Sequence, residues 1–146
     1  MLFTLNPMQS HVLRFFCIYL ATGLVFWLAD ALWLGVVIKD FIARELGDLL
    51  IASPRKLPAI VFYLGYVVAI VVFAVLPALR SESALTALGL GALLGLCAYA
   101  TYDLSNLATL QRWSTRFALV DMGWGTAVTA LAAMAGYLAG GLLALR

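Results

Sequence analysis

Residues 57–79 read LPAIVFYLGYVVAIVVFAVLPAL, and none of their side chains is charged. An α-helix rises about 1.5 Å per residue, so an apolar helix of this length crosses the hydrocarbon core of a bilayer, which is about 30 Å thick. Apolar runs that form core helices of soluble proteins are usually shorter. The stretch therefore predicts a transmembrane helix.

The composition extends this interpretation to the whole chain. Hydrophobic residues make up 65% of the 146 residues and charged residues only 11%, whereas soluble domains have about 25% charged residues. The backbone must satisfy its own hydrogen bonds in lipid, which leaves helices or a closed barrel, and the unbroken apolar runs lack the alternation of barrel strands. We predict a single integral membrane domain over residues 1–146. The nine basic residues are scattered over short loops, so the sequence gives no support to nucleic-acid binding.

Three further apolar runs accompany the one quoted. Together the four runs cover residues of about 15–38, 57–79, 84–110 and 117–145, with polar segments between them. The connections at 80–83 and 111–116 are so short that the helices they join must be antiparallel. We therefore predict an all-α polytopic membrane protein whose four transmembrane helices form an up-and-down bundle.

The longest connection, residues 39–56, has an amphipathic pattern. Ile42, Leu46, Leu49 and Leu50 fall on one helical face, and the charged residues fall elsewhere. This pattern is typical of a helix lying in the membrane interface, and a solvated loop is the alternative.

The distribution of Lys and Arg predicts the orientation, because basic residues are retained on the cytoplasmic side. Three lie at one end of the predicted bundle, namely Arg14, Arg80 and Arg146. Six lie at the other end, namely Lys39, Arg44, Arg55, Lys56, Arg112 and Arg116. We expect both termini outside and the two basic loops in the cytoplasm.

A cleavable secretory signal is the alternative for the first run, because Ala29-Asp30-Ala31 fits a small-residue cleavage pattern. Bulky Trp27 and Trp33 flank that site, and the apolar run continues past it. We therefore favour a retained transmembrane helix.

Metal and nucleophile chemistry have little support. Cys17 and Cys97 lie in different spans without metal-ligand spacing, so we expect them to act as small apolar side chains. His11 is the only histidine, which makes a Ser-His-Asp triad or a zinc site hard to build. We predict no metal site, and the sequence identifies no cofactor.

Three carboxylates inside the predicted spans, Asp30, Asp103 and Asp121, are the best indication of function. An ionised Asp at the centre of a bilayer helix costs about 2.5 to 3.5 kcal/mol on insertion scales, so such residues usually face a protein interior or a cavity. No Lys or Arg lies deep in a span to neutralise them. Carboxylates brought close together share a proton or bind a cation.

Polar and aromatic residues accompany these carboxylates at one depth. Tyr99, Tyr102, Asp103 and Asn106 are spaced as one helical stripe, and the alternating direction of the spans brings the other members to the same leaflet. By the charge count this is the cytoplasmic leaflet. The predicted pocket comprises Asp30, Trp33, Tyr63, Tyr66, Tyr99, Tyr102, Asp103, Asn106, Asp121 and Trp124.

Several of these residues have alternative roles. Trp33, Tyr63 and Tyr66 are equally typical of aromatic anchors at a membrane interface, and we interpret Trp113 as such an anchor. Asp121 lies close to the start of its span, where the helix dipole favours an acidic side chain in the first turn. Asp103 is alternatively a buried structural partner.

Small residues mark the opposite half of the bundle. Gly91 and Gly95 in the third span and Gly136 and Gly140 in the fourth form two GxxxG patterns, which let helices approach closely. We expect the two pairs to come level with each other and to close the outer end. Homodimerisation is the alternative use of these faces.

Three stretches, FWLADALWLGVV, YATYDLSNLATL and VDMGWGTAVTAL, resemble a family of small bacterial membrane proteins catalogued as a domain of unknown function. The resemblance spans nearly the whole chain and implies a four-helix protein of the bacterial inner membrane. It brings no established activity. The positions that it marks are Asp30, Trp33, Tyr102, Asp103, Asn106, Asp121, Trp124 and Gly125.

Three functions fit these observations. The leading hypothesis is a membrane-embedded pocket that binds or modifies a lipid or small hydrophobic molecule, with the carboxylates orienting its polar head. The second is a small transporter coupled to protons or cations. The third is an accessory subunit of a larger membrane complex, in which the polar cluster only fixes helix register. Whether the chain is an enzyme stays open, and the expected partners are membrane lipids, a second copy or a larger complex.

Overall fold

The computed structural model describes residues 7–144, and this part of the chain is helical with no strands. Four helical segments within it are long and apolar enough to cross a membrane: residues 10–37, 56–80, 84–109 and 115–143. The predicted all-α fold with four spanning helices is therefore confirmed. The first helix begins at Pro7, earlier than predicted, and the other limits agree with the prediction to within two residues.

The first and second segments each contain a wide π-helical turn. In the first, α1 (Pro7–Leu32) continues into η1 (Trp33–Val37). In the second, α3 (Lys56–Ile70), η3 (Val71–Val75) and α4 (Leu76–Arg80) follow without a break. Pro77 has no N–H to donate back into the preceding turn, which accounts for the irregular hydrogen bonding of η3.

The third and fourth segments are the long helices α5 (Ala84–Thr109) and α6 (Thr115–Ala144). Both begin at a serine cap. The Ser83 hydroxyl accepts the amide of Thr86 at 3.2 Å, and the Ser114 hydroxyl accepts the amide of Phe117 at 3.2 Å. These bonds satisfy amide groups that have no partner inside the helix, so the short connections define where each helix starts.

The connection between the first two segments contains a short helix, α2 (Lys39–Leu46), followed by a 3-10 turn, η2 (Gly47–Leu49). Leu46 is buried, whereas Leu49 and Leu50 remain exposed. The amphipathic helix is thus present but ends before the last two residues of the predicted apolar face. Its position relative to a membrane surface stays a prediction.

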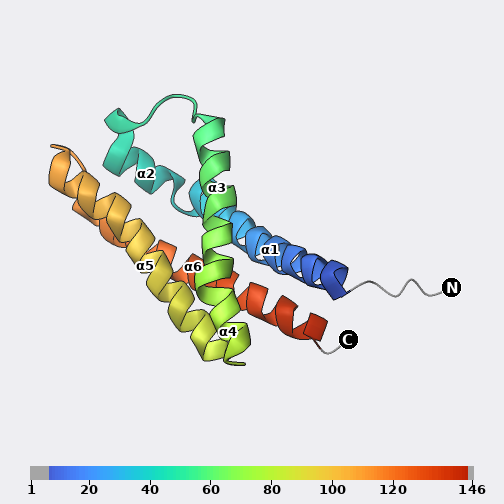
Figure 1. Ribbon diagram of the computed structural model, residues 1–146. Coiled ribbons are helices and arrows are strands. Elements are labelled where there is room, and N and C mark those ends of the chain that lie inside the picture. Colours follow the sequence, from blue (N-terminus) through green and yellow to red (C-terminus); the bar gives the residue numbers. More distant parts are fainter. Residues whose placement is uncertain (1–6, 145–146) are drawn as a thin grey trace.

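The helix α6 is at the centre of the packing, because it contacts α1, α2, α3, η3, α4 and α5. Figure 1 shows α5 lying along α6, and α3 crossing α6 obliquely with its beginning well away from α5. The core includes fully buried apolar side chains from α1, α3, η3 and α6: Phe26, Ile70, Val71, Val75 and Val128.

Glycines permit the closest approaches between these helices. A Cβ atom at Gly91 would lie 2.8 Å from the Cβ of Ala133, and one at Gly95 would lie 2.8 Å from the Cβ of Thr129. Both distances are too short, so α5 can pack this closely on α6 only with glycine at these positions. The α5 pair therefore packs within the chain.

The expectation that the two GxxxG pairs come level with each other is wrong. A Cβ at Gly136 would overlap Thr22 of α1, and a Cβ at Gly140 would lie 2.7 Å from Leu79 of α4. The α6 pair thus faces α1 and the end of the second segment, whereas the α5 pair meets α6 nearer its middle. The helical register of the α5–α6 hairpin, set by its short turn, separates the two pairs.

Candidate functional site

A cavity of about 360 Å³ lies between the end of α1, α3, α5 and the beginning of α6. Its lining comprises Asp30, Leu34, Phe62, Tyr63, Ala98, Tyr99, Tyr102, Phe117 and Asp121. We call it the carboxylate cavity. It contains carboxylates and tyrosine hydroxyls, and neither Lys nor Arg is among its lining residues.

Burial distinguishes the floor of the carboxylate cavity from its rim. Asp30 and Asp121 are only 5% and 8% exposed, whereas Leu34, Phe62 and Tyr102 are 40%, 48% and 54% exposed. The exposed residues come from η1, α3 and α5, so we take the mouth of the cavity to lie between these three elements. A molecule entering there meets aromatic rings first and carboxylates last.

Asp30 connects three helices. The hydroxyl of Tyr63 on α3 donates to its Oδ2 atom, and the indole Nε1 of Trp124 on α6 donates to its Oδ1 atom at 2.9 Å. Buried carboxylates require such donors, because the lost hydration of the charge is otherwise uncompensated. Asp30 is therefore held in a fixed position at the cavity floor.

Two tryptophans support this arrangement from outside the cavity. The rings of Trp33 and Trp124 stack with centroids 4.3 Å apart and an interplanar angle of 6°. The stack fixes the indole that donates to Asp30. The Nε1 atom of Trp33 is buried and has no hydrogen-bond partner among residues 7–144.

Tyr99 lies on the backbone of α6. A Cβ atom at Gly125 would overlap the Tyr99 ring, so glycine is required for the ring to occupy this position. Tyr99 also interacts electrostatically with both Asp30 and Asp121. The missing side chain of Gly125 thus allows an aromatic ring to lie near both carboxylates.

Asp103 lies behind the cavity rather than in its lining. Its side chain is fully buried, its Oδ1 accepts the Nε1 of Trp113 at 3.3 Å, and its Oδ2 has no hydrogen-bond partner in the described part of the chain. The carboxyl group of Asp121 is close enough to interact with it. The structure thus brings two acidic groups together beside the cavity.

Trp113 does more than the anchor that the sequence suggested. Besides donating to Asp103, its ring meets Tyr102 and Phe117 edge to face, with centroids 5.4 and 5.6 Å apart. The turn after α5 brings Trp113 back to Asp103, and the spacing of residues in the sequence does not predict the conformation of this turn. This residue was therefore missed as a part of the polar cluster.

The remaining predicted residues surround the cavity. Tyr66 is buried beneath it, where its hydroxyl pairs with that of Thr129 at 3.0 Å and its ring stacks on Phe62. Asn106 is half-buried beside Tyr102. Of the ten predicted residues, Asp30, Tyr63, Tyr99, Tyr102 and Asp121 line the cavity, and the other five lie outside its lining. Any functional role for them stays a prediction.

Comparison with protein families matches residues 15–138 to the family described as "predicted membrane protein (DUF2177)". The chain belongs to the DUF2177 family. The match covers most of the sequence, in agreement with the four apolar helices, so the chain is an integral membrane protein. Comparison with curated proteins finds no significant match, and neither does comparison with solved structures.

For this DUF2177 protein the cavity favours ligands that carry positive charge or hydrogen-bond donors. Its lining offers carboxylate and hydroxyl oxygens, and its aromatic rings present faces that attract cations. Among the described residues, no group of three or more His, Cys, Asp and Glu side chains is arranged to hold a metal ion. The apolar lining residues Leu34, Phe62, Ala98 and Phe117 were missed because an apolar residue in a span carries no sequence signal.

Proposed function

We propose that the carboxylate cavity binds a lipid or small hydrophobic molecule whose head group is a cation or a hydrogen-bond donor, such as a lipophilic amine. The observation that carries this proposal is the position of Asp30 and Asp121 at the floor of the cavity behind an aromatic rim. A head group of this kind offsets the free-energy cost of burying the two carboxylates away from water.

The position of the cavity mouth explains why we propose a ligand with a hydrophobic tail. Leu34 and Phe62 lie at the mouth and are exposed on the surface of spanning segments, where lipid is the neighbour. An apolar tail can thus remain in the bilayer while the head group reaches the floor. An anionic head group would instead meet Asp30 and Asp121 with repulsion and find no basic side chain in the lining.

Native mass spectrometry in non-ionic detergent tests this proposal, with laurylamine as the probe and lauric acid as its anionic counterpart. We expect laurylamine adducts on the parent protein, an about tenfold loss of them in Asp121→Asn, and no laurate adduct. The control Asp40→Asn removes the same charge from an exposed position on α2 and should retain the adduct. Equal binding of both amphiphiles, or equal loss in both variants, would contradict the proposal.

A second pair of variants tests the width of the cavity mouth rather than the charge of the cavity floor. Leu34→Trp narrows the mouth and should reduce laurylamine adducts, whereas Leu28→Trp adds the same ring to an exposed position of α1 outside the cavity. Adducts that persist in Leu34→Trp would show that the ligand does not enter through the mouth beside Leu34. The same spectra show whether the protein modifies its ligand, because a modified ligand has a different mass. They also show whether the protein is a homodimer, because a homodimer has twice the mass of one chain.

A proton-coupled transporter is the second candidate, favoured by the proximity of Asp103 and Asp121. Two interacting carboxyl groups share one proton readily, and the buried Oδ2 of Asp103 has no protein donor in the described range. Proteoliposomes with an imposed pH gradient test it. Transport predicts uptake of radiolabelled laurylamine that depends on the gradient beyond its passive distribution and is lost in Asp103→Asn, whereas a binding protein leaves the passive distribution unchanged.

We further propose a location in the bacterial inner membrane, with both termini outside and the carboxylate cavity in the cytoplasmic half. The excess of Lys and Arg around α2 and around the α5–α6 turn supports this orientation.

A further inference from the structure

A second cavity, of about 310 Å³, lies at the opposite end of the bundle, between α1 and α4. His11, Arg14 and Arg80 line it together with apolar side chains that include Phe15, Leu76 and Leu79. We call it the arginine cavity. Arg14 and Asp30 are 16 positions apart on α1, about 24 Å at the helical rise, so the two cavities are separate sites.

Arg14 is held in place by the end of α6. Its Nη2 donates to the carbonyl oxygen of Gly140 at 3.1 Å, near the C-terminal end of that helix, where a positive charge is favourable. A guanidinium group has five N–H donors, and the buried Nε has no partner among the described residues. Arg14 is thus a positioned cation whose hydrogen-bonding capacity is largely unused by residues 7–144.

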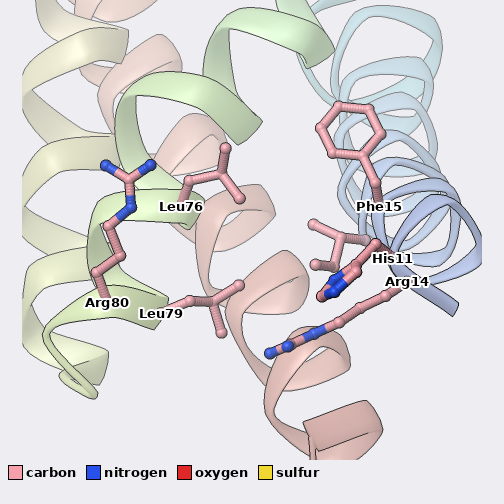
Figure 2. Close-up of a pocket in the computed structure, with 7 residues that line it drawn as sticks. His11, Arg14, Phe15, Leu76, Leu79 and Arg80 are labelled. Carbon is pink, nitrogen blue, oxygen red and sulfur yellow. The ribbon is translucent and has the colours of Figure 1, made fainter. Parts of the chain in front are cut away.

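Figure 2 shows His11 beside Arg14 on α1, Leu76 and Leu79 across the gap on α4, and Arg80 on the far side of the cavity. Arg80 and His11 are exposed. Within residues 7–144, neither side chain forms a hydrogen bond or an ion pair. The cationic groups therefore border the cavity, and its apolar side chains lie between them.

The charge around this cavity is one-sided. No carboxylate side chain lines it. Of the seven Asp and Glu residues in the sequence, only Glu82 lies near this end of the bundle, and the other six lie in the half that contains the carboxylate cavity. Arg14 and His11 on one side of the cavity, Arg80 on the other and no carboxylate in the lining make its surroundings positive, which favours an anionic phosphate group.

We propose that the arginine cavity binds the phosphate of an anionic phospholipid from the adjoining leaflet, with an acyl chain along Phe15, Leu76 and Leu79. The apolar lining favours a phospholipid over free phosphate, because free phosphate gains nothing from these side chains. The location at the end of the spans fits the depth of a lipid phosphate, since α1 crosses the membrane from Ser10 and the second span ends at Arg80.

Titration of the delipidated full chain with phosphatidylglycerol, followed by native mass spectrometry, tests this proposal. Phosphatidylcholine with the same acyl chains is the zwitterionic counterpart and should bind more weakly. We expect Arg80→Gln to reduce phosphatidylglycerol adducts about fivefold and His11→Gln to reduce them less. Arg116→Gln removes an equal charge from an exposed position at the other end of the bundle and should leave the adducts unchanged.

Three results would overturn the proposal: equal affinity for both lipids, equal loss in Arg80→Gln and Arg116→Gln, or no loss in Arg80→Gln. Competition with excess inorganic phosphate separates the two sources of the phosphate group. Retained adducts support the lipid, whereas displacement by inorganic phosphate identifies a phosphate site instead. Arg80→Gln and His11→Gln alter exposed side chains, so the test does not depend on the folding of an Arg14 variant.

Discussion

Asp30 shows how a single buried carboxylate organises the carboxylate cavity. Tyr63 and Trp124 donate to its two oxygen atoms from two other helices, and the Trp33 ring stacks on Trp124. A hydrogen bond to an ionised group is stronger than one between neutral groups. The same contacts that present Asp30 to the cavity therefore also join α1, α3 and α6.

We predict that Tyr63→Phe lowers the free energy of unfolding by about 1 to 3 kcal/mol, because it leaves one oxygen of the buried Asp30 without its donor. Reversible unfolding in mixed micelles, followed by circular dichroism, measures the change. The control is Tyr19→Phe, which removes an exposed hydroxyl that donates to the Leu64 carbonyl at 3.1 Å. Its effect should stay below about 0.5 kcal/mol.

Equal effects in the two tyrosine variants would show that the bond from Tyr63 to Asp30 contributes nothing beyond an exposed hydrogen bond. A stabilised Tyr63→Phe variant would show that Asp30 is satisfied by Trp124 alone.

Among the helices, the contact between α5 and α6 depends on side chains that are absent. A Cβ at Gly95 would overlap the Gly125 carbonyl oxygen and lie 2.8 Å from Thr129. Backbone cannot move aside as a flexible side chain can, so the helices must separate to admit a methyl group. Gly125 also accommodates the ring of Tyr99, which lines the carboxylate cavity. The close contact between Gly95 and Gly125 therefore helps to hold this ring in the cavity lining.

We predict that Gly95→Ala destabilises the protein by about 1 to 3 kcal/mol, as overpacking does in other tightly packed cores. Gly89→Ala is its matched control on the same helix, since nothing lies within 4 Å of a Cβ there. The control should be neutral or slightly stabilising, because alanine favours the helix. Reversible unfolding in mixed micelles compares them, and equal unfolding free energies would contradict the close contact that we describe.

The helices could be predicted from the sequence more fully than their packing. Long apolar runs and short polar turns define the spans, because a bilayer requires both. The register of two helices depends instead on which small residues meet, and four glycines at two GxxxG spacings allow more than one pairing. This is why the expected pairing of Gly91 and Gly95 with Gly136 and Gly140 was wrong.

For the molecule as a whole, the alternating direction of four spans predicts that Asp30, Tyr63, Tyr99 and Asp121 lie at one depth, and all four line the carboxylate cavity. That argument needs only the cost of polar groups in lipid. It could not place Phe62 or Phe117, since aromatic residues are equally common on lipid-facing surfaces. It also gave no indication of the arginine cavity, which forms only where α1 meets α4.

The two cavities give the molecule a chemical polarity, with carboxylates at the end near α2 and arginines at the other end. We predict that this polarity is oriented by the basic loops, so that Gln111 faces the cytoplasm and Ser81 the outside. Both residues are exposed in turns between spans, and Cys17 and Cys97 can be replaced by alanine to leave single-cysteine variants.

In intact spheroplasts, a membrane-impermeant maleimide should label Ser81→Cys at once and Gln111→Cys only after lysis. The inverse pattern would place the carboxylate cavity in the outer half of the membrane. It would also move the arginine cavity to the cytoplasmic leaflet, although neither ligand chemistry would change. Labelling of both sites before lysis would contradict a spanning hairpin, because α5 connects Ser81 to Gln111 over the full thickness of the bilayer.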